Sequence, residues 1–171
     1  TASVGFYLAT PGPLNWLLFC HTLIGVALAA GGTLALNQYL ERDLDACMHR
    51  TRERPLPEGR LQPGEALGFG VAITASGLLY LTLLVNPLSG LVTALSVGSY
   101  LFLYTPLKQK TPLCVIVGAV PGALPPVTGW VAASGQWSLE AWVLFAILFF
   151  WQIPHSLSIA VLYREDYARA N

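Results

Sequence analysis

The sequence predicts an all-α protein that crosses a membrane several times, and three observations support this. First, 54% of the 171 residues are hydrophobic and 11% are charged, whereas soluble domains carry about 25% charged residues. Second, several apolar stretches approach or exceed the roughly 20 helical residues that span a bilayer. Third, all nine Lys and Arg residues fall in alternate connections between these stretches. The formal net charge is zero, so the composition gives no reason to expect a nucleic-acid partner.

Five apolar segments are expected to be full membrane spans, preceded by the tail of another helix. The predicted spans are residues 14–36, 64–85, 87–106, 111–133 and 139–163. The first is expected to continue as helix to about residue 48, and the last to residue 166. Pro and Gly in the breaks, as in "TPGP" and "NPLSG", are typical of helix ends.

The basic residues predict how the spans are oriented. They lie in three places, which are Arg42 to Arg60, Lys108 with Lys110, and Arg164 with Arg169. Because these are alternate connections, they are expected on one side of the lipid bilayer. By the positive-inside rule that side is cytoplasmic. The expected location is the cell membrane, or the mitochondrial inner membrane in a eukaryote.

An acidic motif lies where the first full span leaves the membrane. On a helix, Asn37, Glu41 and Asp45 fall at about 0°, 40° and 80°, whereas Asp43 points nearly the opposite way. Two carboxylates on one face repel each other, and a divalent cation relieves that repulsion. Mg²⁺ prefers oxygen ligands, often one or two carboxylates completed by water and substrate phosphates. The face therefore predicts a magnesium site.

Arginines follow this face directly, at Arg50, Arg52, Arg54 and Arg60. Carboxylates and arginines beside apolar helices suit a substrate with a diphosphate head and an apolar tail, because guanidinium groups bind phosphate oxygens bidentately. The alternative is an ordinary charged cytoplasmic loop. The mixed sign of the charges argues against that alternative, since topology needs only Lys and Arg.

A second polar set lies on the last span, where Gln152, His155, Ser156 and Ser158 interrupt apolar sequence. Ionisable residues inside a membrane are often functional, and the alternative for His155 is a hydrogen bond to a neighbouring helix. If the helix continues, Asp166 lies at the same depth as Asp45 and completes the metal site. The alternative for Asp166 is a solvated helix end.

A third set lies in "YTPLKQKTP", on the remaining cytoplasmic connection. Tyr104 and Lys108 are placed to reach a phosphate at the same mouth of the bundle. The alternative is an interfacial aromatic residue and a lysine that extends to the membrane surface.

These segments together resemble one family. "NQYLERDLDACMHRTRERPLP", "YTPLKQKT", "GAVPGALPPVTGW" and "WQIPHSLSIAVLYREDYARA" are similar to the heme O synthases, or protoheme IX farnesyltransferases, of the UbiA intramembrane prenyltransferase superfamily. The resemblance implies a bundle of nine transmembrane helices around a large cavity. Residues 1–171 then form a single but incomplete transmembrane prenyltransferase domain, from the tail of the first helix to the sixth.

The resemblance also implies roles for particular residues. Related prenyltransferases bind Mg²⁺ through an Asn–Asp–Asp pattern at spacings of four, which Asn37, Glu41 and Asp45 match. Asp166 matches a second acidic motif, with Glu165 as the alternative ligand. Catalytic roles are expected for Asn37, Glu41, Asp45 and His155. Diphosphate binding is expected for Arg50, Arg54, Tyr104, Lys108 and Arg164.

The implied reaction joins farnesyl diphosphate to a vinyl group of heme b, with addition of water, and gives heme O. The product reaches terminal oxidases directly or by way of heme A, so heme A synthase or an oxidase assembly is an expected partner. His155 is expected to contact heme as an iron ligand, a propionate partner or an acid/base.

Two other functions remain open at this point. One is a related prenyltransferase that acts on an aromatic quinone precursor, although such an acceptor gives no reason for an intramembrane His155. The other is a transporter whose polar residues line an ion path. Carboxylates at one mouth, flanked by cations, argue against a transporter.

Overall fold

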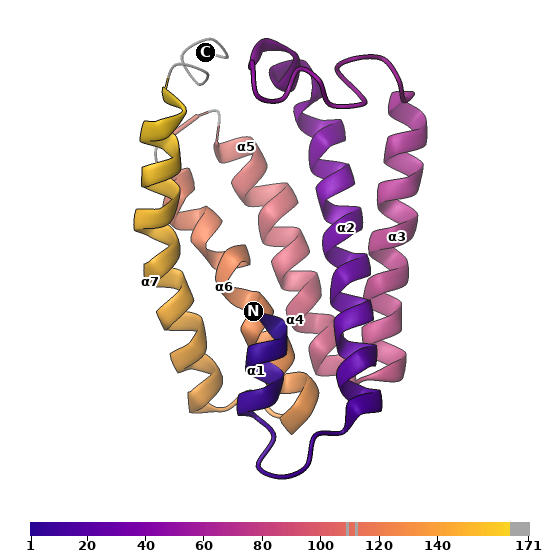
Figure 1. The fold of residues 1–171 in the computed structure, drawn as a ribbon, viewed down its shortest axis with the longest axis vertical. Helices are drawn as coiled ribbons and strands as arrows, with labels where there is room; N and C mark the ends of the chain where they lie inside the picture. The colour runs from indigo at the N-terminus through magenta and orange to yellow at the C-terminus, as the bar shows by residue number, and fades with distance from the viewer. Residues whose placement is uncertain (109, 112, 165–171) are drawn as a thin grey trace.

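The structure, a computed structural model, describes residues 1–108, 110–111 and 113–164, and these form a bundle of helices (Figure 1). In chain order the helices are α1 (Ala2–Leu8), α2 (Trp16–Cys47), α3 (Pro63–Leu84), α4 (Pro87–Gly98), the π-helix η1 (Ser99–Tyr104), α5 (Thr105–Leu107), α6 (Cys114–Ser134) and α7 (Leu139–Leu162). Strands are absent from the described ranges, so the prediction of an all-α fold is confirmed.

Within the residues that the structure describes, five segments are long and apolar enough to span a membrane, as predicted. They are Trp16–Cys47, Pro63–Leu84, Pro87–Leu107, Cys114–Ser134 and Leu139–Leu162, where the third combines α4, η1 and α5. The protein is therefore a multi-pass membrane protein. The predicted extension of the last span to residue 166 falls partly on residues outside the described ranges.

Asparagine caps begin two of the spans. The Asn15 side chain accepts a hydrogen bond from the Leu18 amide at 3.1 Å and starts α2. The Asn86 side chain accepts from the Ser89 amide at 2.8 Å, and Pro87 occupies the first turn of α4. Both caps satisfy amide groups that have no partner inside the helix. The first residues of α2 and α4 are therefore determined by the capping residues directly before them.

Helices α2 and α3 pack closely because glycines line their interface. A Cβ atom on Gly32 would collide with the backbone of Thr74, and one on Gly77 would collide with the backbone of Ala29. Small residues let helix backbones approach in lipid, where packing drives association. The pair therefore forms a rigid wall that carries the acidic motif of α2.

Helix α6 lies at the centre of the bundle and contacts α1, α4 and α7. Val127 and Val131 of α6 form a buried core with Val92 of α4 and Ala141 of α7. The outer face of α7 is exposed and apolar, including Trp142, Ile147 and Phe150.

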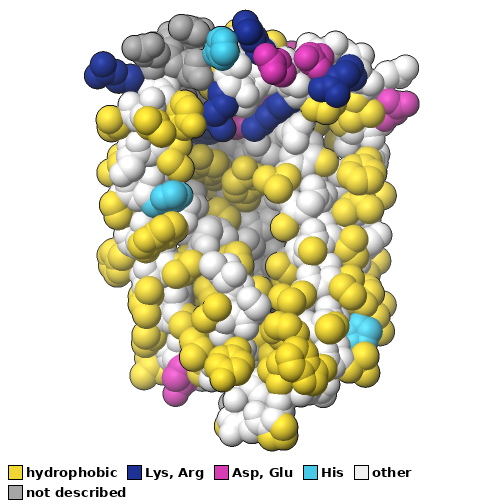
Figure 2. Space-filling view, in the orientation of Figure 1, with side chains coloured by type: hydrophobic (Ala, Val, Ile, Leu, Met, Phe, Trp, Pro, Cys, Tyr) yellow, Lys and Arg dark blue, Asp and Glu magenta, His cyan; other side chains and the backbone are white. Residues whose placement is uncertain are grey.

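The charged segments gather at one end of the bundle. The connection between α2 and α3, the end of α5 and the end of α7 all lie at the upper end in Figure 1. Figure 2 shows Lys and Arg side chains collected at this end, above an apolar flank. The alternation of basic connections in the sequence predicts this arrangement.

Candidate functional site

The acidic face of α2 points into the bundle, as the spacing of four predicts. Asn37, Glu41 and Asp45 are 8%, 3% and 1% exposed, respectively. The side chain of Asp43 is 88% exposed, which agrees with its predicted position on the opposite face. Burying two carboxylates costs free energy unless each is paired. The surrounding contacts show how this cost is met.

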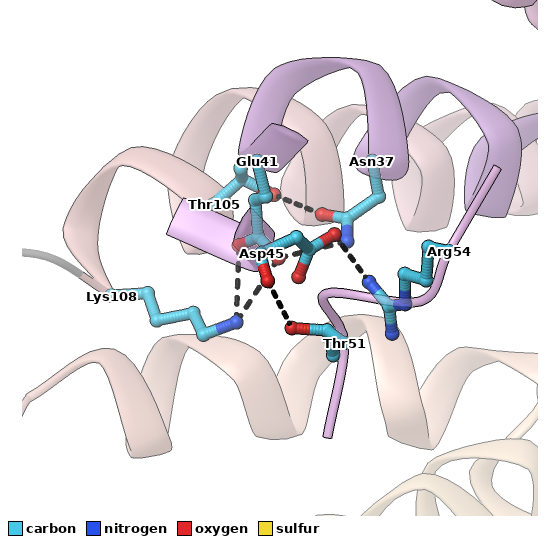
Figure 3. Close-up of polar contacts among 7 residues, drawn as sticks. All are labelled: Asn37, Glu41, Asp45, Thr51, Arg54, Thr105 and Lys108. Carbon is cyan, nitrogen blue, oxygen red and sulfur yellow. Dashed lines mark hydrogen bonds and ion pairs between the residues drawn. The ribbon is translucent and has the colours of Figure 1, made fainter. Parts of the chain in front are cut away.

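Glu41 is paired by a lysine from a distant part of the chain. The Lys108 ammonium, at the end of α5, donates to both carboxylate oxygens of Glu41 at 3.1 Å. The Asn37 amide nitrogen also donates to Glu41, at 3.1 Å. The carboxylate therefore accepts from a cation on one side and from its own helix on the other (Figure 3).

Asp45 is paired by an arginine of the connection between α2 and α3. A terminal nitrogen of Arg54 donates to the Asp45 carboxylate at 2.6 Å. Thr51, only 1% exposed, donates from its hydroxyl to the backbone oxygen of Asp45 at 2.9 Å. These two contacts fold the connection back over the end of α2 (Figure 3).

Thr105 joins the acidic motif to the π-helix η1. Its hydroxyl lies 3.1 Å from the Asn37 side-chain oxygen and 2.9 Å from the Tyr100 backbone oxygen. Pro106 follows directly, and a proline ring crowds the carbonyl four residues earlier, which accounts for the wider turn before it. The π-helix thereby places Thr105 against α2.

An apolar cavity of about 660 Å³ lies below this cluster, within the range of small-molecule sites. Helices α2, α4, η1, α6 and α7 contribute to its wall. Tyr100 and Tyr104 line it as a stacked pair with ring centroids 5.4 Å apart, and Lys108 stands at the same cavity. Figure 2 shows this face hollowed beneath the basic side chains.

The structure brings most of the predicted set to one mouth, but not all of it. Arg50 lies at the surface with its guanidinium 5.1 Å from the centre of the Tyr163 ring, so the α2–α3 connection contacts the end of α7. Arg164 is exposed. His155 is also exposed, stacks on Trp151 with ring centroids 4.5 Å apart, and is not among the residues that line the cavity.

Oxygen donors suited to Mg²⁺ are present at the mouth. These are the carboxylates of Glu41 and Asp45 and the side-chain oxygen of Asn37, each buried and on one face. Within the described residues, no cluster of three or more His, Cys, Asp or Glu side chains could hold a metal ion. Asp166, the predicted third carboxylate, and Glu165, its alternative, lie outside those residues. Two carboxylates and an amide oxygen nevertheless fit an ion that keeps water and phosphate oxygens as its other ligands.

The sequence did not predict two residues that contact the acidic motif, Thr51 and Thr105. Both are buried hydroxyls that bond to the acidic motif from other segments. Thr105 directly precedes a proline and lies three residues before Lys108, which was the one local signal of its position. Thr51 sits among arginines and gives no such signal.

The fold and the cluster define a multi-pass membrane protein with a charged, oxygen-rich mouth above an apolar cavity. The chain belongs to the UbiA prenyltransferase family, whose family model matches residues 1–171.

Curated relatives narrow the resemblance further. A protoheme IX farnesyltransferase of Solibacter usitatus is 52% identical over 99% of this chain and 61% of its own length. That of Opitutus terrae is 45% identical over 98% of this chain and 57% of its own. That of Alkalilimnicola ehrlichii is 42% identical over 100% of this chain and 57% of its own length. The chain thus spans less than two thirds of the length of these relatives. No solved structure gives a significant match.

Proposed function

We propose that this protein transfers the farnesyl group of farnesyl diphosphate to a vinyl group of heme b, giving heme O. The observation that carries the proposal is the position of the Glu41–Lys108 and Asp45–Arg54 pairs directly over an apolar cavity. A diphosphate head and an isoprenoid tail need these two surroundings side by side. The similarity to proteins named protoheme IX farnesyltransferase supports heme b as the acceptor.

The mouth is proposed to bind the diphosphate together with Mg²⁺. Glu41, Asp45 and the Asn37 oxygen hold the ion, with Asp166 as a further ligand, and the bound ion stabilises negative charge on the leaving diphosphate. Lys108 and Arg54 exchange a carboxylate partner for phosphate oxygens, since both are cations within reach of the same space. The remaining diphosphate-binding residues in the proposal are Arg50, Tyr104 and Arg164.

The cavity is proposed to protect the allylic cation that forms as diphosphate leaves. Its apolar wall excludes bulk water, which would otherwise hydrolyse the cation. The stacked rings of Tyr100 and Tyr104 present π-faces that attract positive charge. The catalytic contact of His155 with heme stays a prediction, because in the described part of the chain His155 is exposed and does not line the cavity.

The surroundings of the enzyme follow from the same proposal. The basic end of the bundle faces the cytoplasm, in the cell membrane or, in a eukaryote, from the matrix side of the mitochondrial inner membrane. Heme O passes to heme A synthase or to a terminal oxidase assembly.

The deciding experiment uses the full-length protein in liposomes with labelled farnesyl diphosphate. Heme b and an aromatic quinone precursor are offered separately, with and without Mg²⁺, and products are identified by mass spectrometry. Mg²⁺-dependent label on heme supports the proposal. Label on the aromatic acid instead identifies a related prenyltransferase, and label on neither acceptor rejects prenyl transfer.

A further inference from the structure

A second polar cluster lies in the cavity wall, apart from the charged mouth. Gln152 and Ser156 stand one turn apart on α7, and both line the cavity. At 1.5 Å per residue they lie about 15 Å and about 9 Å below the end of α7 at Leu162, inside the membrane-spanning part.

These two side chains differ from the threonines that line the cavity. Thr33 donates to the Ala29 oxygen at 2.6 Å, and the hydroxyls of Thr93 and Thr128 lie 3.4 Å apart. Gln152 and Ser156 make no side-chain hydrogen bond within the ranges that the structure describes. A polar group in an apolar interior costs free energy until it has a partner. The two groups therefore form a site that a bound molecule can satisfy.

A backbone carbonyl of a neighbouring cavity-lining residue also lacks its helical donor. Proline has no amide hydrogen, so Pro125 and Pro126 remove the helical donors of the Pro121 and Gly122 carbonyls. Ser96 replaces the donor at Pro121 with a hydroxyl at 3.1 Å. In the described part of the chain no side chain does so for Gly122.

Gly122 faces Gln152 directly. A Cβ atom on Gly122 would lie 3.0 Å from the Gln152 side-chain carbon Cδ and 3.1 Å from its oxygen. The missing side chain therefore leaves the backbone open to the carboxamide and to the cavity.

The chemistry of the cluster selects its ligand. A carboxamide, a hydroxyl and a carbonyl offer both donors and acceptors but no charge, which suits a neutral oxygen rather than an ion. A water molecule needs two to four polar partners of this kind. We propose that Gln152, Ser156 and the Gly122 carbonyl hold the water that ends the farnesyl transfer, an inference that rests on the proposed function.

Farnesyl transfer and the addition of water then proceed through two bond-forming steps. The bond between farnesyl C1 and oxygen breaks, and its electron pair leaves on diphosphate. The terminal vinyl carbon of heme then bonds to C1, which leaves a cation on the vinyl carbon next to the ring. The held water bonds to that carbon through oxygen, and its proton goes to the released diphosphate. Gln152 and Ser156 position the water and take no proton themselves.

Without a held water the same cation has another fate. It loses a proton from the adjacent carbon and gives an alkene, which is lighter than the alcohol by one water. The ratio of alcohol to alkene therefore reports on the water site independently of the rate of farnesyl transfer.

The test uses the full-length protein in liposomes with farnesyl diphosphate and heme b in ¹⁸O-labelled water. The variants are Gln152→Leu, Ser156→Ala and their combination. The matched control is Ser158→Ala, since the exposed Ser158 hydroxyl bonds to its own helix at the Pro154 oxygen, 2.8 Å away. Ser156→Thr keeps the hydroxyl and serves as the rescue variant.

We expect the wild type, Ser158→Ala and Ser156→Thr to give mainly the ¹⁸O-labelled alcohol. The double variant still farnesylates heme, but its ratio of alcohol to alkene falls about tenfold, the effect of losing one to two hydrogen bonds. A wild-type ratio in the double variant overturns the water site while leaving the proposed function intact. A wild-type enzyme that puts no farnesyl on heme overturns the proposed function, and this inference with it. Ser156→Ala removes a single oxygen, so its ratio of alcohol to alkene tests the water site even where the double variant does not fold.

Discussion

The charged mouth and the cavity wall differ in how their polar side chains are paired. At the mouth, Glu41 is held by Lys108 and Asp45 by Arg54, so each carboxylate has a cation. In the wall, Gln152 and Ser156 have no such partner among the described residues. A paired charge contributes to folding before any ligand arrives, whereas an unpaired polar group gains its partner only on binding. Substitutions in the two regions should therefore change stability and chemistry in different proportions.

The largest effect is expected at Asp45. Asp45→Ala removes a proposed Mg²⁺ ligand at the mouth, and farnesyl transfer by the full-length enzyme should fall about a thousandfold or more, because a metal supplies several kcal/mol of transition-state stabilisation. Heme binding, measured by absorbance, should persist. The matched control Asp43→Ala removes an exposed carboxylate from the opposite face and should stay near wild type. Equal losses in the two variants would contradict the argument from the shared face.

The next effect concerns the stability of the paired region. Lys108→Met leaves the Glu41 carboxylate, whose side chain is 4% exposed, without its cation. Breaking a buried pair typically costs about 3–5 kcal/mol, and the partial exposure of Lys108 brings the expected loss toward about 2 kcal/mol. Thermal unfolding in detergent measures it. The double variant Lys108→Met/Glu41→Gln should recover part of the loss, since no charge is then left unpaired. A double variant less stable than Lys108→Met would show that the pair is not the cause.

A smaller effect is expected at Thr105, which positions the Asn37 amide. Thr105→Val keeps the shape of the side chain and removes the donor to the Asn37 oxygen. One hydrogen bond contributes about 1 kcal/mol, so the turnover number should fall about fivefold. Thr105→Ser keeps the hydroxyl and should recover most of the activity. The apparent affinity for Mg²⁺ should weaken with the turnover number, and an unchanged affinity would place the role of Thr105 elsewhere.

The features that the sequence predicted are those that depend on local pattern. The five spans follow from runs of apolar residues, and the inward face of Asn37, Glu41 and Asp45 follows from helical periodicity. The single charged end follows from the alternation of basic connections. None of these needs knowledge of which helices touch.

The features that the sequence did not predict depend on such contacts. Thr51 and Thr105 act on the acidic motif only because two distant segments fold against α2. On α7 the sequence marked Gln152, His155 and Ser156 as polar residues in an apolar helix. Which of them meets the cavity depends on where α6 packs, and that is a tertiary property. In the structure Gln152 and Ser156 line the cavity, whereas His155 is exposed and does not line it.

The smallest effect, and the sharpest contrast with Lys108, is expected from Gln152→Leu in the protein without substrates. Leucine has a similar volume and no polar atoms, so the substitution removes an unsatisfied carboxamide from the membrane-embedded cavity wall. Replacing such a group by an apolar one of the same shape is close to neutral or stabilising. The melting temperature should therefore stay unchanged or rise slightly, while Lys108→Met lowers it clearly. Ser158→Ala is the control for a polar side chain removed from the same helix, because the Ser158 hydroxyl donates to the Pro154 oxygen within α7. A melting temperature that falls as far in Gln152→Leu as in Lys108→Met would mean that Gln152 already has a partner in the folded protein. The polar groups of the mouth and of the cavity wall would then not differ in whether they are paired before a ligand binds.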